Sequence, residues 1–296
     1  MNRIAAYATY LPRFVLSREE AKGAWPQLAM GPRSKSVPSL DEDPLTMAAQ
    51  AGLRVLERAG IEGEQLAGVL LATSSSPYVV KSGAAIVADY LNAPASASIA
   101  DFGAGSQAGL AALVGALRDV GLAARGPILV IGSDALFGPA NDPLDLGLGA
   151  AAAAFLVGSD GFAALAEFDF GYSSYANVWQ PAGERQLHRY DDDRFERHAG
   201  WGPQMAAGVA RLRERAGAEA DLYALSLPPN GRGDAALAGV DGGAGGAQGT
   251  AEGERLLALG LAQVGVAGAE REPVRIADGG ADLDPHGDVE VAHHLT

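Results

Sequence analysis

Cysteine is absent from this chain of 296 residues. Its absence excludes disulfide bonds, thiolate metal sites and thiol nucleophiles. The sequence also has no uninterrupted apolar run of roughly 18 to 20 residues, the length that a membrane-spanning helix requires. The first residues do not combine a charged segment, an apolar run and a small-residue cleavage site. We therefore expect a cytoplasmic protein without a membrane span.

Positive charge is scarce, because 22 Lys and Arg residues face 36 Asp and Glu residues, for a formal net charge of −14. Proteins that bind nucleic acids gather Lys and Arg against the phosphates, so a nucleic acid is not an expected partner. Hydrophobic residues make up 48% of the chain, which predicts a folded globular core rather than disorder.

Three consecutive carboxylates, Asp191, Asp192 and Asp193, form a pattern that metal sites also use. A stable metal site needs further ligands that converge from other parts of the chain. We interpret the run as a solvated loop and expect no metal. His188, close by in the sequence, is interpreted as an exposed loop residue.

Helical and extended patterns alternate along the chain, which predicts an α/β protein with helices packed on a mostly parallel sheet. The clearest helix spans residues 43–60, with Asp43 as its cap, Pro44 in its first turn and Gly60 as its stop. Apolar runs predict buried strands. Further helices are expected at 82–91, 107–120, 200–216 and 254–264, and strands at 3–10, 66–72, 97–100, 126–131, 150–157, 163–170 and 221–227.

Several short motifs occur in one order along the chain. They include Tyr7-Ala-Thr-Tyr-Leu-Pro-Arg13, Ser34-Lys-Ser-Val-Pro38, Ser76-Pro-Tyr-Val-Val-Lys81, Ala100-Asp101, Gly132-Ser-Asp134 and Pro229-Asn-Gly231. In this order they resemble the archaeal and bacterial 3-hydroxy-3-methylglutaryl-CoA (HMG-CoA) synthases, which are relatives of the thiolases and ketoacyl synthases. The resemblance implies a thiolase fold of five layers (αβαβα) in two pseudo-repeated halves. We place these halves at residues 1–165 and, in shortened form, 166–296.

The same resemblance implies where catalytic residues should lie. In the family a cysteine at a helix N-terminus is acylated by acetyl-CoA, a glutamate removes a proton from the second acetyl group, a histidine assists at the carbonyl, and an asparagine supports the oxyanion. The corresponding positions of this chain are Ser106 for the cysteine, Ser74 for the glutamate, Leu227 for the histidine and Gly249 for the asparagine. A serine hydroxyl ionises far above neutral pH and does not replace a carboxylate base.

Two interpretations of Ser106 remain open. It is either a small residue that fills a former active-site turn, or a nucleophile that an unidentified base activates. Asn230 and Arg232 follow the family's coenzyme A motif; Arg232 either binds a phosphate or is a solvated loop charge. We expect no bound cofactor other than a coenzyme A thioester as a possible ligand.

The substitutions favour a non-catalytic subunit that forms a homodimer or a heterodimer with a thiolase-fold paralogue. Family dimers join along an edge strand of the first half, which we place near residues 95–99. The alternatives are an acyltransferase that uses Ser106 and a non-catalytic acyl-CoA-binding protein.

Overall fold

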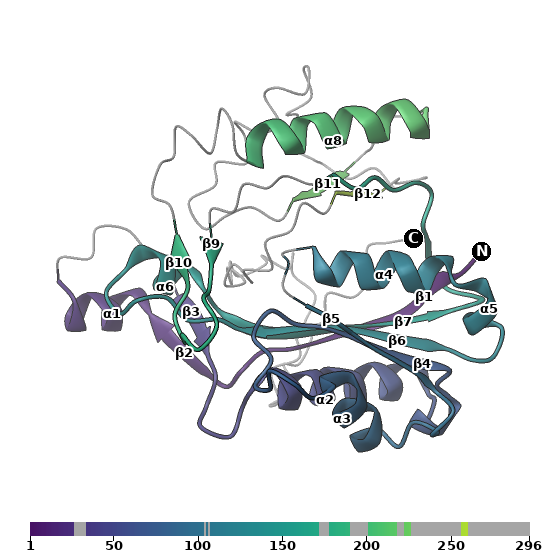
Figure 1. The fold of residues 1–296 in the computed structure, drawn as a ribbon, viewed down its shortest axis with the longest axis horizontal. Helices are drawn as coiled ribbons and strands as arrows, with labels where there is room; N and C mark the ends of the chain where they lie inside the picture. The colour runs from purple at the N-terminus through teal and green to yellow at the C-terminus, as the bar shows by residue number, and fades with distance from the viewer. Residues whose placement is uncertain are drawn as a thin grey trace, which may run out of the picture.

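The structure, a computed structural model, describes residues 1–26, 34–103, 105, 107–171, 178–189 and 201–217, and the backbone of 222–225 and 256–259. Its centre is a six-stranded sheet with the order β5-β4-β6-β7-β1-β8 (Figure 1). The strands are β1 (Arg3–Tyr10), β4 (Gly68–Ala72), β5 (Ser98–Phe102), β6 (Ile128–Ala135), β7 (Ala150–Gly158) and β8 (Ala163–Ala164).

The sheet is mixed, so the expectation of a mostly parallel sheet needs correction. Strand β4 pairs in parallel with β5 and β6, whereas β7 is antiparallel to both β6 and β1, and β8 is antiparallel to β1. The alanine-rich strand β7 therefore lies between β6 and β1, and the first strand of the chain is far from β4 in the sheet.

Strands β4 and β6 form the centre of the core. All five residues of β4 are buried, and seven of the eight residues of β6 are buried. The sequence predicted that β6 would stop before Gly132, but the strand continues to Ala135. It continues because β7 offers alanine partners up to that end, and because the Ser133 Oγ donates a hydrogen bond to the Pro44 carbonyl oxygen at 2.6 Å.

Helices cover both faces of this sheet. Helix α2 (Pro44–Ala59) has the predicted ends: the Asp43 carboxylate accepts hydrogen bonds from the N–H groups of Leu45 and Thr46, and Gly60 ends it in the left-handed conformation, at φ 66°. Helices α2 and α3 (Gly83–Tyr90) lie on one face, and α4 (Ala108–Arg118) lies on the other (Figure 1).

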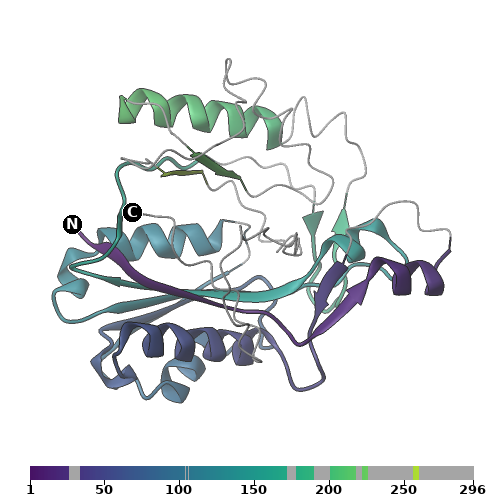
Figure 2. The same ribbon diagram turned by 180° about the vertical axis from the view of Figure 1, so that it is seen from behind.

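Beyond α4 lie two further layers, a two-stranded parallel sheet of β11 (Leu222–Leu225) and β12 (Leu256–Leu259), and then α8 (Trp201–Ala216) (Figures 1 and 2). This helix-sheet-helix-sheet-helix order confirms the expected five-layered fold. The helix predicted over residues 254–264 is wrong where the chain is described, because the apolar run Leu256–Leu259 pairs with β11 and satisfies its backbone in that ladder.

Smaller elements lie around these layers. Strands β2 (Phe14–Ser17) and β3 (Ser34–Val37) form a separate antiparallel pair. A mostly buried ion pair between Lys35 Nζ and Asp145 Oδ2, at 2.8 Å, connects this pair to α6 (Pro143–Gly147). Strands β9 (Val178–Trp179) and β10 (His188–Arg189) form another pair. The remaining elements are α1 (Arg18–Ala24), η1 (Gly63–Gln65) and α5 (Val120–Ala123). Among the helices described, none combines the length and the apolar character that crossing a membrane would need.

His188 lies on the β9–β10 pair and not on a loop. Its ring is partly exposed, its Nε2 is 2.5 Å from Glu184 Oε2, and it stacks on Trp179. These contacts give His188 a structural role in the hairpin. The Asp191–Asp193 run lies outside the described residues.

An acidic side chain, Asp169, links α8 to the segment that follows β8. The predicted strand over 163–170 ends at Ala164, and the segment that follows packs against helices instead. Asp169, whose side chain is 5% exposed, accepts hydrogen bonds from Arg211 at 2.7 Å and is 3.1 Å from the Arg215 NH1. Phe168 lies under the Arg118 guanidinium of α4, at 4.7 Å from ring centroid to Cζ. This segment therefore lies between α4 and α8.

Replacing this carboxylate should loosen α8. We expect Asp169→Asn to lower the free energy of unfolding by about 1–3 kcal/mol, because two guanidinium groups lose a buried charged acceptor while they remain partly solvated. The measurement is urea unfolding of both proteins. Asp89→Asn, an exposed charge neutralisation on α3, is the control, and equal losses in the two variants would contradict the assigned role of Asp169.

Candidate functional site

The ends of β4, β5 and β6 meet beside Ser74, the residue that the resemblance puts at the position of the family's glutamate. The first residue after β4, Thr73, donates its backbone N–H to the Phe102 carbonyl oxygen at 3.0 Å. Ser74 follows at once. Its side chain is exposed, and its backbone N–H donates to Asp134 Oδ1 at 2.7 Å. Ser74 thus lies on a turn tied to both neighbouring strands.

Asp134 is the buried carboxylate that holds this turn. It is 2% exposed, near the end of β6. Its Oδ1 accepts hydrogen bonds from the Thr73 hydroxyl (3.1 Å), the Ser74 N–H (2.7 Å) and the Ser75 hydroxyl (2.8 Å). The Ser75 Oγ in turn accepts the N–H of Ala135 at 2.9 Å. The cluster joins the residues after β4 to the last residues of β6.

Burial raises the pKa of Asp134 to about 6, against the lowering effect of these hydrogen bonds. The carboxylate is engaged with the turn and covered from solvent, so it does not offer an exposed base on the site surface. Its geometry makes it a positioning group for the Thr73–Ser75 turn.

A second acidic residue positions α3. Asp101, on β5, accepts the N–H of Ala84 through its Oδ1 at 2.8 Å, so a carboxylate lies at the N-terminal end of this helix. Gly83 permits the close approach, because a Cβ at this position would lie 2.8 Å from the side chains of both Leu45 and Leu71. The Ala100-Asp101 motif therefore fixes the packing of α3 on β5.

Helix α4 begins at Ala108, two residues after Ser106 in the sequence. The Ala108 N–H donates to the Gly105 carbonyl oxygen at 3.1 Å, and the helix ladder starts from Gln107. Ser106 itself lies outside the described residues, as do Leu227, Asn230, Arg232 and Gly249. Among the predicted site residues only Ser74 is therefore placed, and the meeting of the others stays a prediction.

The sequence analysis quoted Asp134 as part of a motif but did not identify it as a site residue. The available signal was an aspartate three residues after the run Ile128–Ile131, since a carboxylate near the end of a buried strand needs hydrogen-bond donors nearby. The hydroxyl-rich segment Thr73–Ser76 supplied those donors at the end of the neighbouring strand.

The raised pKa of Asp134 gives a stability change with a definite sign. A carboxyl with a folded-state pKa of about 6 and an ordinary value of 3.8 binds more protons when folded, so ionisation between these values destabilises the fold. From pH 4 to pH 7 we expect the wild type to lose up to about 3 kcal/mol relative to Asp134→Asn, which keeps the acceptor oxygen. Unfolding free energies at several pH values measure this difference. Asp89→Asn accounts for the loss of one charge, and a difference that stays flat or moves the other way would contradict the buried-carboxylate account.

Known proteins resemble this chain in both sequence and fold. The HMG-CoA synthase of Pyrococcus furiosus is 34% identical over 170 residues, which cover 57% of this chain and 49% of that protein. The synthase of Thermococcus sibiricus is 33% identical over 213 residues, covering 71% of this chain and 61% of that protein. The chain thus spans about half the length of the first of these relatives. No protein-family model matches the chain.

Solved structures agree on the fold. The 3-oxoacyl-(acyl carrier protein) synthase III of Pseudomonas aeruginosa superimposes with a TM-score of 0.68 at 24% identity, over 81% of this chain and 80% of that one. An HMG-CoA synthase complexed with CoA superimposes with a TM-score of 0.65 at 19% identity, over 81% of this chain and 63% of that one. The family suggested by the motifs is confirmed: the chain is a relative of the HMG-CoA synthases and has the thiolase fold.

Proposed function

We propose that the chain is a non-catalytic, HMG-CoA synthase-like subunit that pairs with an active acyl-CoA condensing enzyme of the same fold. The observation that carries the proposal is an open sheet edge at β5, beside exposed apolar side chains. Ser74 supports it, because an exposed hydroxyl occupies the position where the family has a carboxylate base.

The edge strand β5 pairs only with β4 among the described strands. Its sequence, Ser98–Phe102, contains neither proline nor lysine, which proteins use to keep edge strands from pairing. A second subunit that adds its own edge strand would satisfy the free N–H and C=O groups and extend the sheet across the interface.

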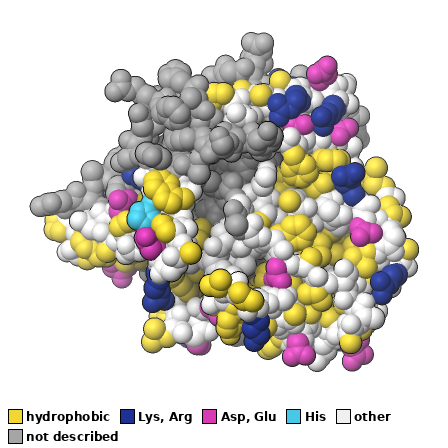
Figure 3. Space-filling view, in the orientation of Figure 1, with side chains coloured by type: hydrophobic (Ala, Val, Ile, Leu, Met, Phe, Trp, Pro, Cys, Tyr) yellow, Lys and Arg dark blue, Asp and Glu magenta, His cyan; other side chains and the backbone are white. Residues whose placement is uncertain are grey.

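Exposed apolar side chains lie on β5, on α3 and on the loop before α3. We call them the edge group: Tyr78 (47% exposed), Val79 (103%), Val80 (93%), Tyr90 (55%) and Ile99 (38%). Figure 3 shows hydrophobic side chains gathered over β5 and α4. Exposed apolar side chains that gather on one part of a surface are typical of an interface in soluble proteins.

Helix α4 supports the same interpretation. It is apolar nearly all round, a pattern that indicates a fully buried helix, yet Leu110, Ala111 and Leu113 are only partly buried. Helix α4 packs on β5 as well as on β4, β6 and β7. A partner that covers β5 would also cover part of α4.

Charges placed in the edge group should prevent pairing. We expect the wild type to sediment as a dimer, alone or co-expressed with a catalytically intact thiolase-fold paralogue of its host. The double substitution Val80→Asp and Ile99→Lys should yield a monomer, because it buries unpaired charges in the interface.

The matched control is Leu40→Lys, which adds a charge at a fully exposed leucine outside the edge group. It should leave the assembly intact. A wild type that is monomeric both alone and with the paralogue would contradict the proposed subunit role.

A second candidate function is acyl transfer by Ser106. The position favours it, since Ser106 comes two residues before α4, where helix N–H groups stabilise an oxyanion. Intact-mass measurement after incubation with acetyl-CoA distinguishes the two functions. The subunit proposal predicts no acetyl adduct, and an adduct that disappears in Ser106→Ala would establish the transferase.

A third candidate is simple acyl-CoA binding through Asn230 and Arg232. Calorimetry with acetyl-CoA tests this candidate. A heat of binding that is lost in Arg232→Gln would favour an acyl-CoA-binding protein over a subunit that binds no acyl-CoA.

A further inference from the structure

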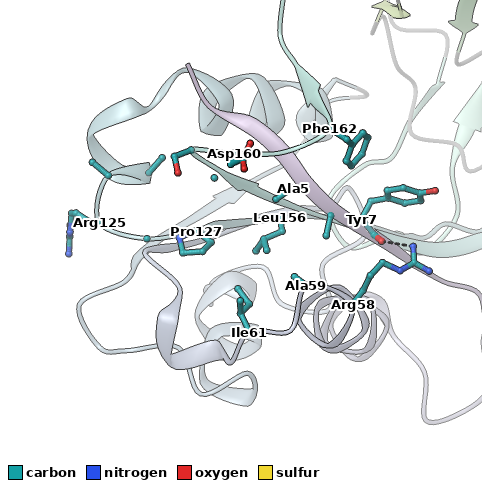
Figure 4. Close-up of a pocket in the computed structure, with 16 residues that line it drawn as sticks. Ala5, Tyr7, Arg58, Ala59, Ile61, Arg125, Pro127, Leu156, Asp160 and Phe162 are labelled. Carbon is teal, nitrogen blue, oxygen red and sulfur yellow. Dashed lines mark hydrogen bonds between the residues drawn. The ribbon is translucent and has the colours of Figure 1, made fainter. Parts of the chain in front are cut away.

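A hollow of about 810 Å³ opens at the opposite end of the sheet from Ser74 and Asp134. Its walls come from β1, the C-terminal end of α2, the α5–β6 connection and the turn after β7 (Figure 4). Pro127, just before β6, lines it, whereas Asp134 lies near the other end of that strand. At about 3.3 Å per residue the two ends of β6 are roughly 23 Å apart. The hollow is therefore separate from the family's site.

Backbone irregularities and small side chains create this space. The pairing of β1 with β7 shifts between Ile4 and Ala6, so Ala5 is a bulged residue at the wall. On the β7 side, a Cβ added to Gly158 would meet only the Asp160 carbonyl oxygen, at 3.9 Å. The volume is within the range of small-molecule sites, about 300–1,000 Å³.

The lining combines an apolar floor with a fixed cation. Leu156 and Pro127 lie across the middle in Figure 4, with Tyr7 and Phe162 at one side, where their rings meet edge to face at 6.1 Å. Phe162 is 57% exposed, so its ring is available to a ligand.

Arg58 is the cation. Its NH1 donates to the Tyr7 carbonyl oxygen at 2.9 Å, and its guanidinium lies 5.4 Å from the Tyr7 ring centroid. These contacts hold the group at the rim, and its other N–H groups have no partner among the described residues. Arg125 also lines the hollow, but its NH2 donates to the Ser96 carbonyl oxygen at 3.1 Å, and its side chain points away from Leu156 in Figure 4. Asp160 is the carboxylate of the lining, so Arg58 supplies the local cation in a chain whose net charge is −14.

We infer that this hollow binds a small amphipathic anion, with its apolar body over Leu156 and Phe162 and its acidic group on Arg58. A planar carboxylate, or two of the three oxygens of a sulfonate, matches the fork of donors that a guanidinium offers. A ligand in this hollow would bind at the opposite end of the sheet from any acyl-CoA site near Ser74. The inference therefore does not rest on the subunit proposal.

The probe is 8-anilino-1-naphthalenesulfonate, an aromatic anion whose fluorescence rises on burial, titrated against the whole chain. We expect one saturable site. Arg58→Gln should weaken binding at least about tenfold, because a charge-assisted hydrogen bond is lost. N-Phenyl-1-naphthylamine, the same dye without the sulfonate, should bind weakly and be insensitive to Arg58→Gln.

Gly158→Phe should abolish the site by filling it. Circular dichroism shows whether Gly158→Phe folds. If it does not, Ala124→Phe, at the exposed rim, is the variant that fills the hollow. The double variant Val79→Ser and Val80→Ser should keep the affinity, since it removes only exposed apolar surface of the edge group. Dye binding that survives both phenylalanine variants, or that only the serine variant removes, would overturn the inference, as would the absence of saturable binding.

Discussion

The structure depends on the burial of β4 and β6 on both faces. A strand with apolar residues on both sides of the sheet needs a helix layer on each side. Helices α2 and α3 supply one layer and α4 the other, so α4 itself becomes an internal helix. Its nearly uniform apolar sequence then requires a further cover, and β11, β12 and α8 lie on that side. The need to cover both faces of β4 and β6 thus accounts for the five layers of the fold.

The same burial explains why polar groups near the strand ends are so tightly satisfied. Ser133 and Asp134 lie in a strand whose neighbours are alanines, and each finds its partner on a different element: Pro44 at the start of α2 and the Thr73–Ser75 turn. An unpaired carboxylate there would cost several kcal/mol, so the hydroxyl-rich turn and the aspartate depend on each other. This end of the sheet is therefore a framework of satisfied polar groups, with the Ser74 side chain exposed beside it.

Local features of the fold could be predicted from the sequence, whereas long-range ones could not. The ends of α2 follow from Asp43, Pro44 and Gly60, because capping is a property of a few adjacent residues. The position of β1 beside β7 could not be predicted, because it depends on pairing between residues some 150 positions apart. The extension of β6 past Gly132 and the strand at Leu256–Leu259 were missed for the same reason: each depends on a partner strand that local patterns do not reveal.

The candidate site shows a similar division. The structure puts Ser74 just after β4, and its correspondence to the family's glutamate stays a prediction. The role of Asp134 was not predicted, because it depends on the contact between two strand ends. The sequence match to the first relative covers about half of that protein's length. The edge of β5, which pairs only with β4 among the described strands, and the exposed Ser74 hydroxyl are the observations on which we propose assembly rather than condensation.

The most direct measurement of this account is the release of free coenzyme A from acetyl-CoA and acetoacetyl-CoA by the purified chain. The account predicts release no faster than in buffer. Release well above that background, and lost when Ser106 is replaced by alanine, would contradict it.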